Sequence, residues 1–562
     1  MPAGGQASKA APFVGCNLVR FRGKGTPRVE GHEPVAFRDL YTLDQEPLGE
    51  GRYSRVYAAT HRLTGARRAV KTAMRKGAKH MIEDYGMECP ARLAIHEASI
   101  LRLMDHPSVI RLHEVHDEEN VVHLVLELCE GADVLERILS NSGRLPETEI
   151  ANMFVQMLAG VWHVHAQGAA HRDLKPEHFL FTRREPDRLP APPWRAAVKL
   201  IDFGLGHQEL IGYKPGGGTP QFMPPEAIAG GKIVDVQALA KAMAGDMWSL
   251  GVILHAMLVG HYPSPKLSDK TMPAYLKKPA WQNCSADCLD MMGSLLKQKP
   301  DERPTSAGAL RHNWSRAAER ARGSVPPSML QELPRAVQEH VASPGLVRLA
   351  LRAIACEIDD FEVFEVRLLF QLLVTECGGD ITADTLRQMA SGSEDLRKVA
   401  PALGQEFEKL HGSAQGAVLW SEFLAMVLAG AHLAKSSLSA TARPLLSDET
   451  VFSAFDRLRY DTPTVSGATL ALLCPPASSR QATAEAQAEP EAARFAALVR
   501  QVCPSGAVAP EDFLDLVTNP RATRAKVPAA GPGRPSKGFF GCLCGSKSMP
   551  DESEGGTAAN QL

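Results

Sequence analysis

The sequence predicts an α+β fold: a two-lobed domain, with a small sheet-rich lobe before a larger helical lobe, followed by an all-α region. Strand-like apolar runs come early in the chain, as in SRVYAAT at 54–60 and VVHLVLEL at 121–128, and helical periodicity dominates after Val134. Between residues 358 and 518 an apolar helix–loop–helix pattern repeats four times. Such repetition indicates stacked or paired copies of one supersecondary unit.

The composition of the 562-residue chain is that of a globular protein. Hydrophobic residues make up 44% and charged residues 22%, which excludes a wholly disordered, collagen-like or coiled-coil chain. Lysine and arginine number 62 against 64 acidic residues, so the net charge of −2 creates no chain-wide basic field. We therefore expect two to four domains and no nucleic-acid partner.

The cysteines and the apolar runs favour a cytoplasmic protein. The 11 cysteines are odd in number and scattered, without the paired short spacings of a zinc site, which fits a reducing compartment. The strongest apolar run, VVHLVLELC at 121–129, has the length of a buried strand and not the roughly 20 residues of a membrane span. Residues 1–38 hold Gly, Pro and several basic side chains without a sustained period, and we expect a disordered basic arm.

The first chemical motif is LGEGRYSRVY at 48–57. Gly49 and Gly51, between strand-like flanks, would let the backbone turn tightly over the phosphates of a nucleotide, although a plain hairpin turn explains the same pattern. Lys71 then ends the strand-like ARRAVK, where it can reach two phosphates, and Glu97 in a helical segment would hold it by an ion pair. Taken singly, each charge also fits a solvated surface position.

Five further motifs follow in a fixed order. They are HRDLKPEH at 171–178, IDFG at 201–204, GTPQFMPPE at 218–226, DMWSLGVIL at 246–254 and ERPT at 302–305. In this order the motifs resemble those of the eukaryotic protein kinase family. The resemblance implies a two-lobed kinase domain over residues 41–316, with ATP in the cleft between the lobes.

The resemblance also implies the site residues. Asp173 would accept or orient the proton of the substrate hydroxyl, Lys175 would neutralise the transferring phosphoryl group, and Asp202 would hold Mg²⁺. Thr219 would brace the catalytic loop, and the lysine of RDLKPE implies a serine/threonine enzyme. The residues implied for ATP binding are Leu48, Gly49, Gly51, Val56, Ala69, Lys71, Glu127, Cys129, Leu180 and Asp202.

Three other features of the kinase resemblance carry expectations. Glu226 and Arg303 match a buried ion pair of the large lobe with a structural role. Asp133 and Glu177 fall where kinases that prefer basic substrates keep acidic residues. We therefore expect protein substrates with basic residues upstream of the acceptor.

One metal-binding position departs from the kinase pattern. The family motif ends in an asparagine that ligates a second Mg²⁺, and here His178 replaces it. An imidazole is a poor ligand for Mg²⁺, which prefers hard oxygen atoms. This departure keeps a second hypothesis open, that of a pseudokinase that binds nucleotide weakly and acts as a scaffold. The retention of Lys71, Glu97, Asp173 and Lys175 favours the active enzyme.

The chain resembles in particular the calcium-dependent protein kinase family, with degenerate EF-hands in its C-terminal half. The segments LMDHPSVIRLHEV and VLELCEGADVLERI match that branch, and SPGLVRLALRAIACEIDD at 343–360 is similar to its junction segment. The resemblance implies junction or autoinhibitory helices at 318–357 and four EF-hand-like repeats at 358–518, with a linker at 475–493. It also implies contact between the kinase domain and the EF-like region within one chain.

The calcium chemistry is largely missing from these repeats. An EF-hand loop needs oxygen ligands at positions 1, 3 and 5 and a bidentate Glu at position 12. Loop one offers only Glu376, and loop two keeps Glu422 at position 12 but has His411 at position 1. Loop three starts with Asp456 and is then broken by Pro463. We expect weak or absent Ca²⁺ binding, with Glu422 and Asp456 as weak ligand candidates and the repeats kept for packing.

The C-terminal tail, 519–562, is basic and is expected to be disordered. Within it, GFFGCLCG at 538–545 places two phenylalanines beside Cys542 and Cys544. Basic charge, apolar side chains and acylatable thiols together favour a peripheral, reversible membrane contact. A plain disordered tail is the alternative, and in both cases we expect a cytoplasmic protein.

Overall fold

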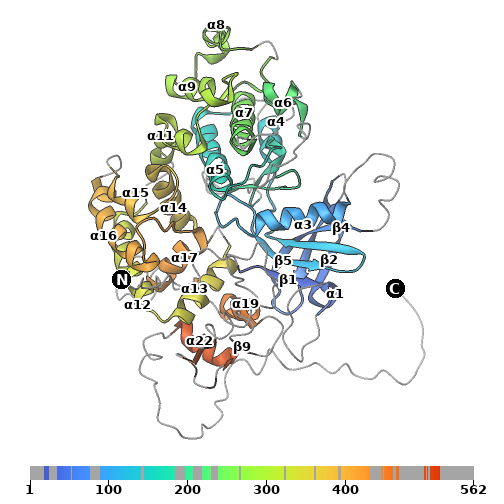
Figure 1. Cartoon of the computed structure of the whole chain (residues 1–562), viewed down its shortest axis with the longest axis vertical. Helices are drawn as coiled ribbons and strands as arrows, with labels where there is room; N and C mark the ends of the chain where they lie inside the picture. Colours follow the sequence, from blue (N-terminus) through green and yellow to red (C-terminus); the bar gives the residue numbers. More distant parts are fainter. Residues whose placement is uncertain are drawn as a thin grey trace, which may run out of the picture.

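The computed structural model is an α+β chain whose two-lobed domain is followed by a helical region, as predicted (Figure 1). The strands of the small lobe, the helices of the large lobe and the C-terminal helices form three groups around a shared interior. The structure describes residues 18–23, 35–51, 54–75, 89–140, 145–183, 197–206, 218–229, 238–264, 267–321, 325–359, 362–389, 394–430, 445–446, 448–459, 464–466, 496, 499–500, 503, 505 and 507–518.

The small lobe contains a six-stranded sheet in the order β1-β5-β6-β4-β3-β2. Strand β1 runs parallel to β5, and the other neighbours are antiparallel. Its elements are β1 (Arg20–Gly23), α1 (Phe37–Leu40), β2 (Tyr41–Glu50), β3 (Arg55–His61), β4 (Arg67–Met74), α3 (Pro90–Leu101), β5 (Leu112–Asp117) and β6 (Val121–Leu126). Helix α3 packs on β4, β5 and β6, which explains why the strand VVHLVL is apolar along nearly its whole length.

The structure corrects the expectation of a free N-terminal arm for part of residues 1–38. Leu18 and Val19 are buried in the core, and Arg20–Gly23 forms β1 at the edge of the sheet. The guanidinium groups of Arg20 and Arg22 both bind the buried carboxylate of Glu114 on β5. Strand β1 could not be predicted from the sequence, because its apolar partners lie far along the chain. The alternation of buried and half-buried side chains in the strand itself covers only four residues.

The large lobe is helical and holds one short two-stranded ribbon. Its elements are α4 (Val134–Ser140), α5 (Glu147–Ala166), β7 (Phe179–Phe181), β8 (Val198–Leu200), α6 (Pro225–Ile228), α7 (Ala238–Val259), α8 (Met272–Tyr275), α9 (Ala286–Leu295), α10 (Ser306–Leu310) and α11 (Asn313–Ala321). Helix α7 has the length and composition of a membrane span, which sequence analysis did not note. It packs against α5 and α9 in the interior, and this explains its apolar composition.

The C-terminal region consists of helices joined in EF-hand-like pairs. Its elements are α12 (Pro327–Ala342), α13 (Gly345–Glu357), α14 (Phe364–Cys377), α15 (Ala383–Arg387), α16 (Glu394–His411), α17 (Trp420–Ala429), α19 (Asp448–Arg459), β9 (Val465–Ser466), β10 (Ala507–Val508) and α22 (Pro510–Thr518). Val418 N donates a 3.0 Å hydrogen bond to Ile381 O, which joins the first two loops. Val465 and Val508 pair in the β9–β10 ribbon, which joins the last two.

Helix α13 forms the centre of this region. The segment GLVRLALRAIACE is aliphatic on most of its faces, and it packs against α17, α19 and α22. Helix α12 packs against α16 and α17. Helix α12, from the segment expected to form junction or autoinhibitory helices, therefore packs as part of the EF-like region. The predicted linker at 475–493 and the tail at 519–562 lie outside the described residues.

Buried polar contacts bind the C-terminal region to the two-lobed domain. Arg352 of α13 lies 3.4 Å from the carboxylate of Asp105, and Arg68 of β4 lies 2.6 Å from that of Glu357. At loop one, a Cβ on Gly379 would lie only 2.5 Å from Trp162 Nε1 on α5, so a glycine is needed for this approach. The two parts therefore share one interior.

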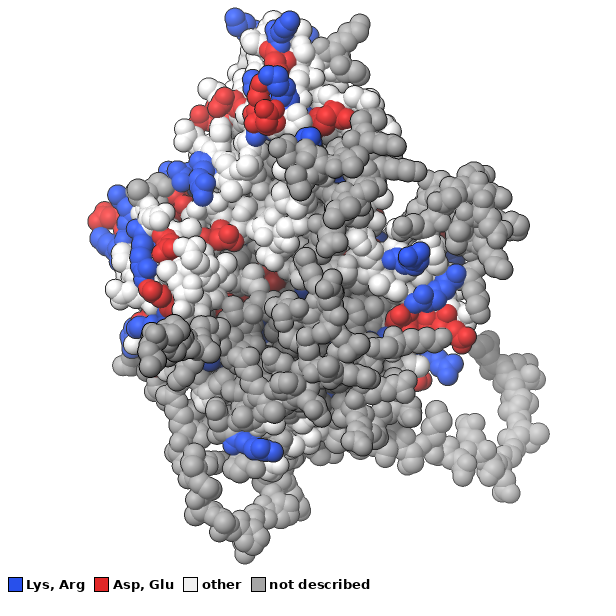
Figure 2. All heavy atoms as spheres, viewed as in Figure 1, with Lys and Arg blue, Asp and Glu red and all other residues white. Residues whose placement is uncertain are grey.

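The visible surface carries both charge signs side by side (Figure 2). On α15 and α16 the basic side chains of Arg387, Lys398 and Lys409 each pair with a nearby carboxylate. Exposed pairs of this kind contribute little to stability but keep the surface free of a single-sign field. The mixed pattern agrees with the near-neutral composition.

Candidate active site

Lys71 of β4 is held between two carboxylates from other elements. Its Nζ lies 2.7 Å from Glu97 Oε2 on α3 and 2.9 Å from Asp202 Oδ1 beyond β8. Burial would lower the pKa of Lys71, but the two carboxylates outweigh burial and raise the pKa above its ordinary value. The structure therefore brings three of the predicted residues together, with the ammonium group of Lys71 fixed between the carboxylates of Glu97 and Asp202.

Asp202 adopts a backbone conformation that is uncommon for a residue other than glycine. Its φ is 62°, in the left-handed region, and the next residue, Phe203, is fully buried with its ring 4.9 Å from that of His171. Burial would raise the pKa of Asp202, but Lys71 and His178 outweigh it and hold the pKa below its ordinary value. Asp202 is thus ionised, with Oδ1 next to Lys71.

Asp246 of α7 fixes the loop that carries the catalytic motif. Its buried carboxylate accepts hydrogen bonds from the backbone N–H groups of His171 at 2.8 Å and Arg172 at 2.7 Å. It also accepts one from His165 Nε2 at 2.9 Å, and Arg172 has a left-handed φ of 71°. Asp246 begins the DMWSLGVIL motif, but the motif alone did not indicate a role for this residue. The signal was present, because a lone carboxylate within an apolar helix needs a partner.

Asp173 is oriented by Thr219, as the sequence predicted. Asp173 Oδ1 accepts hydrogen bonds from Thr219 N at 2.8 Å and from Thr219 Oγ1 at 2.9 Å. Lys175 Nζ lies 3.7 Å from the other carboxylate oxygen, Oδ2. One oxygen of Asp173 is therefore used to orient the group, and the other faces a cation.

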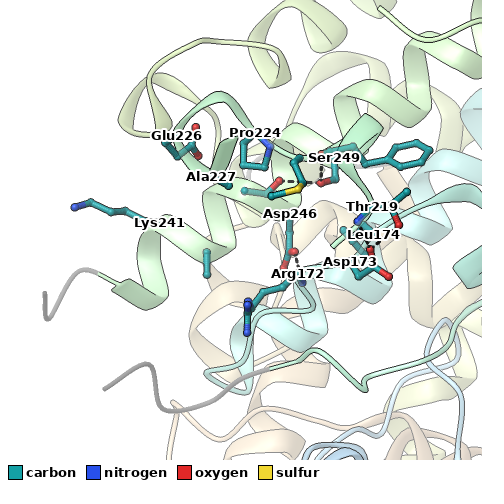
Figure 3. Close-up of a pocket in the computed structure, with 14 residues that line it drawn as sticks. Arg172, Asp173, Leu174, Thr219, Pro224, Glu226, Ala227, Lys241, Asp246 and Ser249 are labelled. Atoms are coloured by element: carbon teal, nitrogen blue, oxygen red, sulfur yellow. Dashed lines mark hydrogen bonds between the residues drawn. The ribbon is translucent and has the colours of Figure 1, made fainter. Parts of the chain in front are cut away.

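A cavity of about 60 Å³ adjoins this carboxylate. Figure 3 shows Asp173 and Thr219 at one end and Ala227 and Lys241 at the other. Leu174, Phe222, Met223 and Pro224 also line the cavity, so most of its wall is apolar. A space of this size accommodates a small side chain or part of a larger one next to Asp173.

His178 faces the metal-binding carboxylate. Its Nδ1 donates a 2.7 Å hydrogen bond to the backbone oxygen of Asp173, and its Nε2 lies 3.5 Å from Asp202 Oδ2. Burial lowers the pKa of His178 to about 4, with a further contribution from the neighbouring His171. The imidazole is therefore neutral near pH 7.

The residues implied for ATP binding include several on strands of the small lobe and on β7. Gly49 pairs with Val56 next to an irregular register of β2, and Gly51 N donates to Ser54 O at 2.8 Å in the turn between β2 and β3. Leu48 lies on β2, and Leu180 lies on β7. Ala69 of β4 pairs with Leu126 of β6 in the sheet.

The connection between the lobes contains an ion pair that sequence analysis missed. Glu127 and Cys129 follow β6, as predicted, and Lys199 of β8 places Nζ 2.9 Å from Glu127 Oε2. Only 1% of the Lys199 side chain is exposed. Lys199 and Glu127 come from distant strands, so no local motif announces their contact.

Comparison with known proteins agrees with this geometry. The protein kinase domain model matches residues 42–315. The chain contains a protein kinase domain. It is 28% identical over 423 residues to calcium-dependent protein kinase 3 of Plasmodium berghei, covering 72% of this chain and 69% of the relative. It is 30% identical over 376 residues to calcium-dependent protein kinase 1 of Oryza sativa subsp. japonica, covering 64% of this chain and 66% of the relative.

Protein kinases use ATP with Mg²⁺, and the donor set of this kinase fits that pair only in part. Lys71 provides the cation for the phosphates, and the ionised Asp202 provides the hard oxygen atoms that Mg²⁺ prefers. The imidazole of His178 does not fit a Mg²⁺ site. The residues thus support one metal position of the usual kind and alter the second.

The ion pair predicted in the large lobe of the kinase is present. Arg303 Nη1 and Nη2 lie 2.7 and 2.8 Å from the two carboxylate oxygens of Glu226, and the Arg303 side chain is fully buried. The guanidinium also lies over the Trp248 ring at 5.0 Å. Two parallel hydrogen bonds fix the position of α6 against α7 and the 3₁₀ turn before α10.

Two acidic side chains predicted to face a substrate lie beside the catalytic loop of the kinase. Asp133 accepts a 2.7 Å hydrogen bond from Glu136 N at the start of α4. Glu177 Oε2 is buried and has no hydrogen-bond partner among the described residues. A buried carboxylate oxygen without a donor is costly, so Glu177 adds an unneutralised acidic group beside the catalytic loop.

The carboxylates of the EF-like loops are engaged by side chains of the kinase chain itself. Glu376 of loop one is buried and lies 3.1 Å from Arg320. Asp456 lies within α19, and its carboxylate is 3.2 Å from Arg20 and 2.7 Å from Arg459. In the structure the carboxylate of Asp456, which the sequence offers as a weak calcium ligand, therefore faces two guanidinium groups.

In loop two an imidazole occupies the interior. His411 Nε2 lies 3.4 Å from Glu422 Oε2, and a Cβ on Gly416 would come within 2.5 Å of the His411 ring. Glu422, the calcium candidate of this loop, therefore lies opposite a histidine that stands in place of the first ligand. Within the described part of the chain, no group of three or more His, Cys, Asp or Glu side chains is arranged to hold a metal ion.

Proposed function

We propose that this chain is a serine/threonine protein kinase that transfers the γ-phosphate of ATP to Ser and Thr hydroxyls of proteins. The observation that carries the proposal is the arrangement of Lys71 between Glu97 and Asp202, together with Asp173 oriented by Thr219. These are the charges that position phosphates and the acceptor in this chemistry. Radiolabelled phosphate transfer by the wild type but not by Asp173→Asn tests it, and equal signals would contradict it.

Each retained residue has a role in the transfer. Lys71 binds phosphate oxygens of ATP, and its two carboxylate neighbours keep it charged and in place. Asp173 accepts the proton of the acceptor hydroxyl through Oδ2, because Oδ1 is occupied by Thr219. Lys175, on the same side, balances charge that develops on the transferring group. Mg²⁺ supplies charge neutralisation at the phosphates, and Asp202 would hold it.

We also propose that the acceptor lies in a basic sequence. Glu177 and Asp133 provide negative charge next to the catalytic loop, and Glu177 Oε2 lacks a donor among the described residues. An upstream arginine would provide that donor. A peptide array tests this, since loss of preference for upstream Arg or Lys in Glu177→Gln is expected, and an array without any such preference in the wild type would contradict the proposal.

The EF-like region is proposed to regulate the kinase by docking with weak or no calcium binding. Its helices bury polar contacts with the kinase domain at Asp105 and Arg68, and Gly379 of its first loop packs closely on Trp162. Its loop carboxylates face arginine or histidine side chains in place of a bound cation. Calorimetry with millimolar Ca²⁺ tests this, and a clear saturable heat that Glu422→Gln abolishes would contradict it.

A pseudokinase scaffold is the second candidate, and His178 is the observation that favours it. The imidazole weakens one metal position, and a kinase that loses both metals cannot neutralise its phosphates. Nucleotide binding without phosphate transfer, unchanged in Asp173→Asn, would support the scaffold. Transfer that requires Asp173 would exclude it.

From the sequence we propose a cytoplasmic protein with peripheral membrane contact through Cys542 and Cys544. Two nearby thiols next to two phenylalanines and basic residues provide the combined signals that stable anchoring requires. Hydroxylamine-sensitive partitioning into membranes is expected. Full solubility of the expressed protein, unchanged by replacing both cysteines, would contradict it.

A further inference from the structure

His178 and Asp202 present two metal-ligand atoms to one point in the cleft. His178 Nε2 and Asp202 Oδ2 are 3.5 Å apart, and neither atom is the one used for the other contacts of these side chains. The second nitrogen of the imidazole donates to Asp173 O, and the other carboxylate oxygen faces Lys71. The His178 side chain is therefore held through Nδ1 and the Asp202 side chain through Oδ1. Nε2 of His178 and Oδ2 of Asp202 are left facing each other.

The hydrogen bond at Nδ1 sets the chemistry of Nε2. Asp173 O is a backbone carbonyl and only accepts, so Nδ1 carries a proton and Nε2 is the nitrogen that can offer a lone pair to a metal ion. A histidine whose other nitrogen donates to a backbone carbonyl is the usual form of a metal-ligating histidine. A lone pair and a carboxylate oxygen at this separation repel unless a cation lies between them.

The spacing suits a metal ion bound to both atoms. With metal–ligand bonds of about 2.1 Å, atoms 3.5 Å apart subtend an angle of roughly 110°, which lies within the range for small divalent ions. The other histidine nearby, His171, is not a competing ligand. Its Nε2 bonds Ile201 O at 3.0 Å, and its Nδ1 accepts from Asp173 N at 3.4 Å.

We propose that His178 Nε2 and Asp202 Oδ2 form a site for a borderline divalent transition-metal ion of the Mn²⁺ type, in preference to Mg²⁺. The inference rests on the proposed function, since phosphate oxygens and water would complete the coordination. One imidazole, one carboxylate and phosphate oxygens form a mixed nitrogen and oxygen donor set, which first-row divalent ions tolerate better than the hard ion Mg²⁺ does, and Mn²⁺ is the member of that series closest to Mg²⁺ in its liking for oxygen. A site with only two protein ligands also agrees with the lack of a three-residue cluster among the described residues.

The test is electron spin-echo spectroscopy of Mn²⁺ bound to the full chain with a non-hydrolysable ATP analogue. The expected result is a ¹⁴N coupling from a directly bound imidazole, which changes to a ¹⁵N coupling when histidine is labelled with ¹⁵N. His178→Asn is the matched variant, because the asparagine amide can still donate to Asp173 O while offering an oxygen ligand. It is expected to lose the nitrogen coupling and to lower the preference for Mn²⁺ over Mg²⁺ at least tenfold.

Three results would overturn the proposal. They are Mn²⁺ bound without nitrogen coupling, a coupling that survives in His178→Asn, and the absence of Mn²⁺ binding at millimolar concentration with the analogue present. The labelled wild type decides the question even if the variant does not fold. Phosphate transfer with Mg²⁺ alone is measured separately, so an active enzyme without nitrogen coupling contradicts only this inference, and an inactive chain with the coupling contradicts only the proposed function.

Discussion

Asp105 of the kinase domain caps the N-terminus of α17 in the EF-like region through Ser421. Asp105 Oδ2 accepts a 2.5 Å hydrogen bond from Ser421 Oγ, and Oδ1 accepts one of 3.1 Å from Ser421 N. Both residues are buried, although 316 positions separate them in the chain. The first N–H groups of a helix have no partner within the helix, so this carboxylate from another domain satisfies them. The contact ties the second EF-like loop to the kinase without a metal ion.

Removing the positive charge beside Asp105 is expected to destabilise the whole chain. Arg352→Met leaves Asp105 buried with only Ser421 and backbone donors, and breaking a buried ion pair costs about 3–5 kcal/mol. Urea unfolding of the full chain measures the loss. Arg387→Met, in an exposed pair with Glu408, is the control and should change stability by less than about 0.5 kcal/mol. Equal effects of the two substitutions would refute the role assigned to Arg352.

Truncation after Arg316 is expected to destabilise the kinase domain instead of activating it. The cut removes α13 and α14, whose apolar side chains share one buried core with the large lobe. It also exposes Trp162, on which Gly379 packs. The expected outcome is a lower yield of soluble protein and a lower melting temperature, measured by calorimetry. A soluble, stable fragment with raised activity would instead support an autoinhibitory C-terminal region.

The hydroxyl of Thr219 is expected to contribute to catalysis by orienting Asp173. Thr219→Ala keeps the backbone N–H bond but loses the 2.9 Å hydrogen bond from Oγ1. Hydrogen bonds to charged groups are worth about 1.5–3 kcal/mol, so kcat/KM should fall roughly 10- to 100-fold. Thr219→Ser keeps the hydroxyl and should retain most of the activity, with unfolding unchanged in both. If serine and alanine lowered kcat/KM equally, the hydroxyl would have no such role.

Stability is expected to decrease below about pH 6.5 because of histidines that are buried in the neutral form. Burial lowers the pKa of His340 to about 3, Glu422 opposes the shift, and Arg348 and Arg352 add to it. The unfolded chain, with a histidine pKa near 6.5, therefore binds a proton that the folded chain does not, from about pH 6.5 down to about pH 3. This group makes unfolding easier by up to about 1.4 kcal/mol per pH unit as the pH falls through that window.

His340→Met should flatten this dependence by about one proton. Urea unfolding of the wild type and of His340→Met at pH 7 and pH 5 measures the change in slope. A His340→Met slope equal to that of the wild type would contradict the assignment of a buried neutral histidine.

Short motifs in the sequence identified residues that the structure brings together. Lys71, Glu97 and Asp202 come from three elements, yet each lies in a segment whose pattern identifies it. The fold class followed in the same way from the order of strand-like and helical segments. The loss of calcium ligands stays a prediction, drawn position by position from the loop sequences.

Long-range pairings could not be predicted, since no local pattern records them. Strand β1 depends on Glu114, which lies 94 positions beyond Arg20, and its four residues show too little alternation to indicate a strand. From the sequence alone Lys199 of β8 would be predicted to lie at the surface, whereas in the fold it is buried beside Glu127. Asp456 begins a plausible calcium loop in the sequence, and only the fold brings Arg20 to its carboxylate. The environments of these residues depend on tertiary contacts.

The central claim is tested most directly by phosphate transfer from ATP to a basic peptide with Mg²⁺ and Mn²⁺ present together. The full-length wild type and Asp173→Asn are each measured with and without Ca²⁺. The structure predicts transfer by the wild type, a loss of about 10²–10⁴-fold in Asp173→Asn, and rates that Ca²⁺ changes less than about twofold. Equal signals from the two proteins would contradict the enzyme, and a strong rise with Ca²⁺ would contradict docking without calcium.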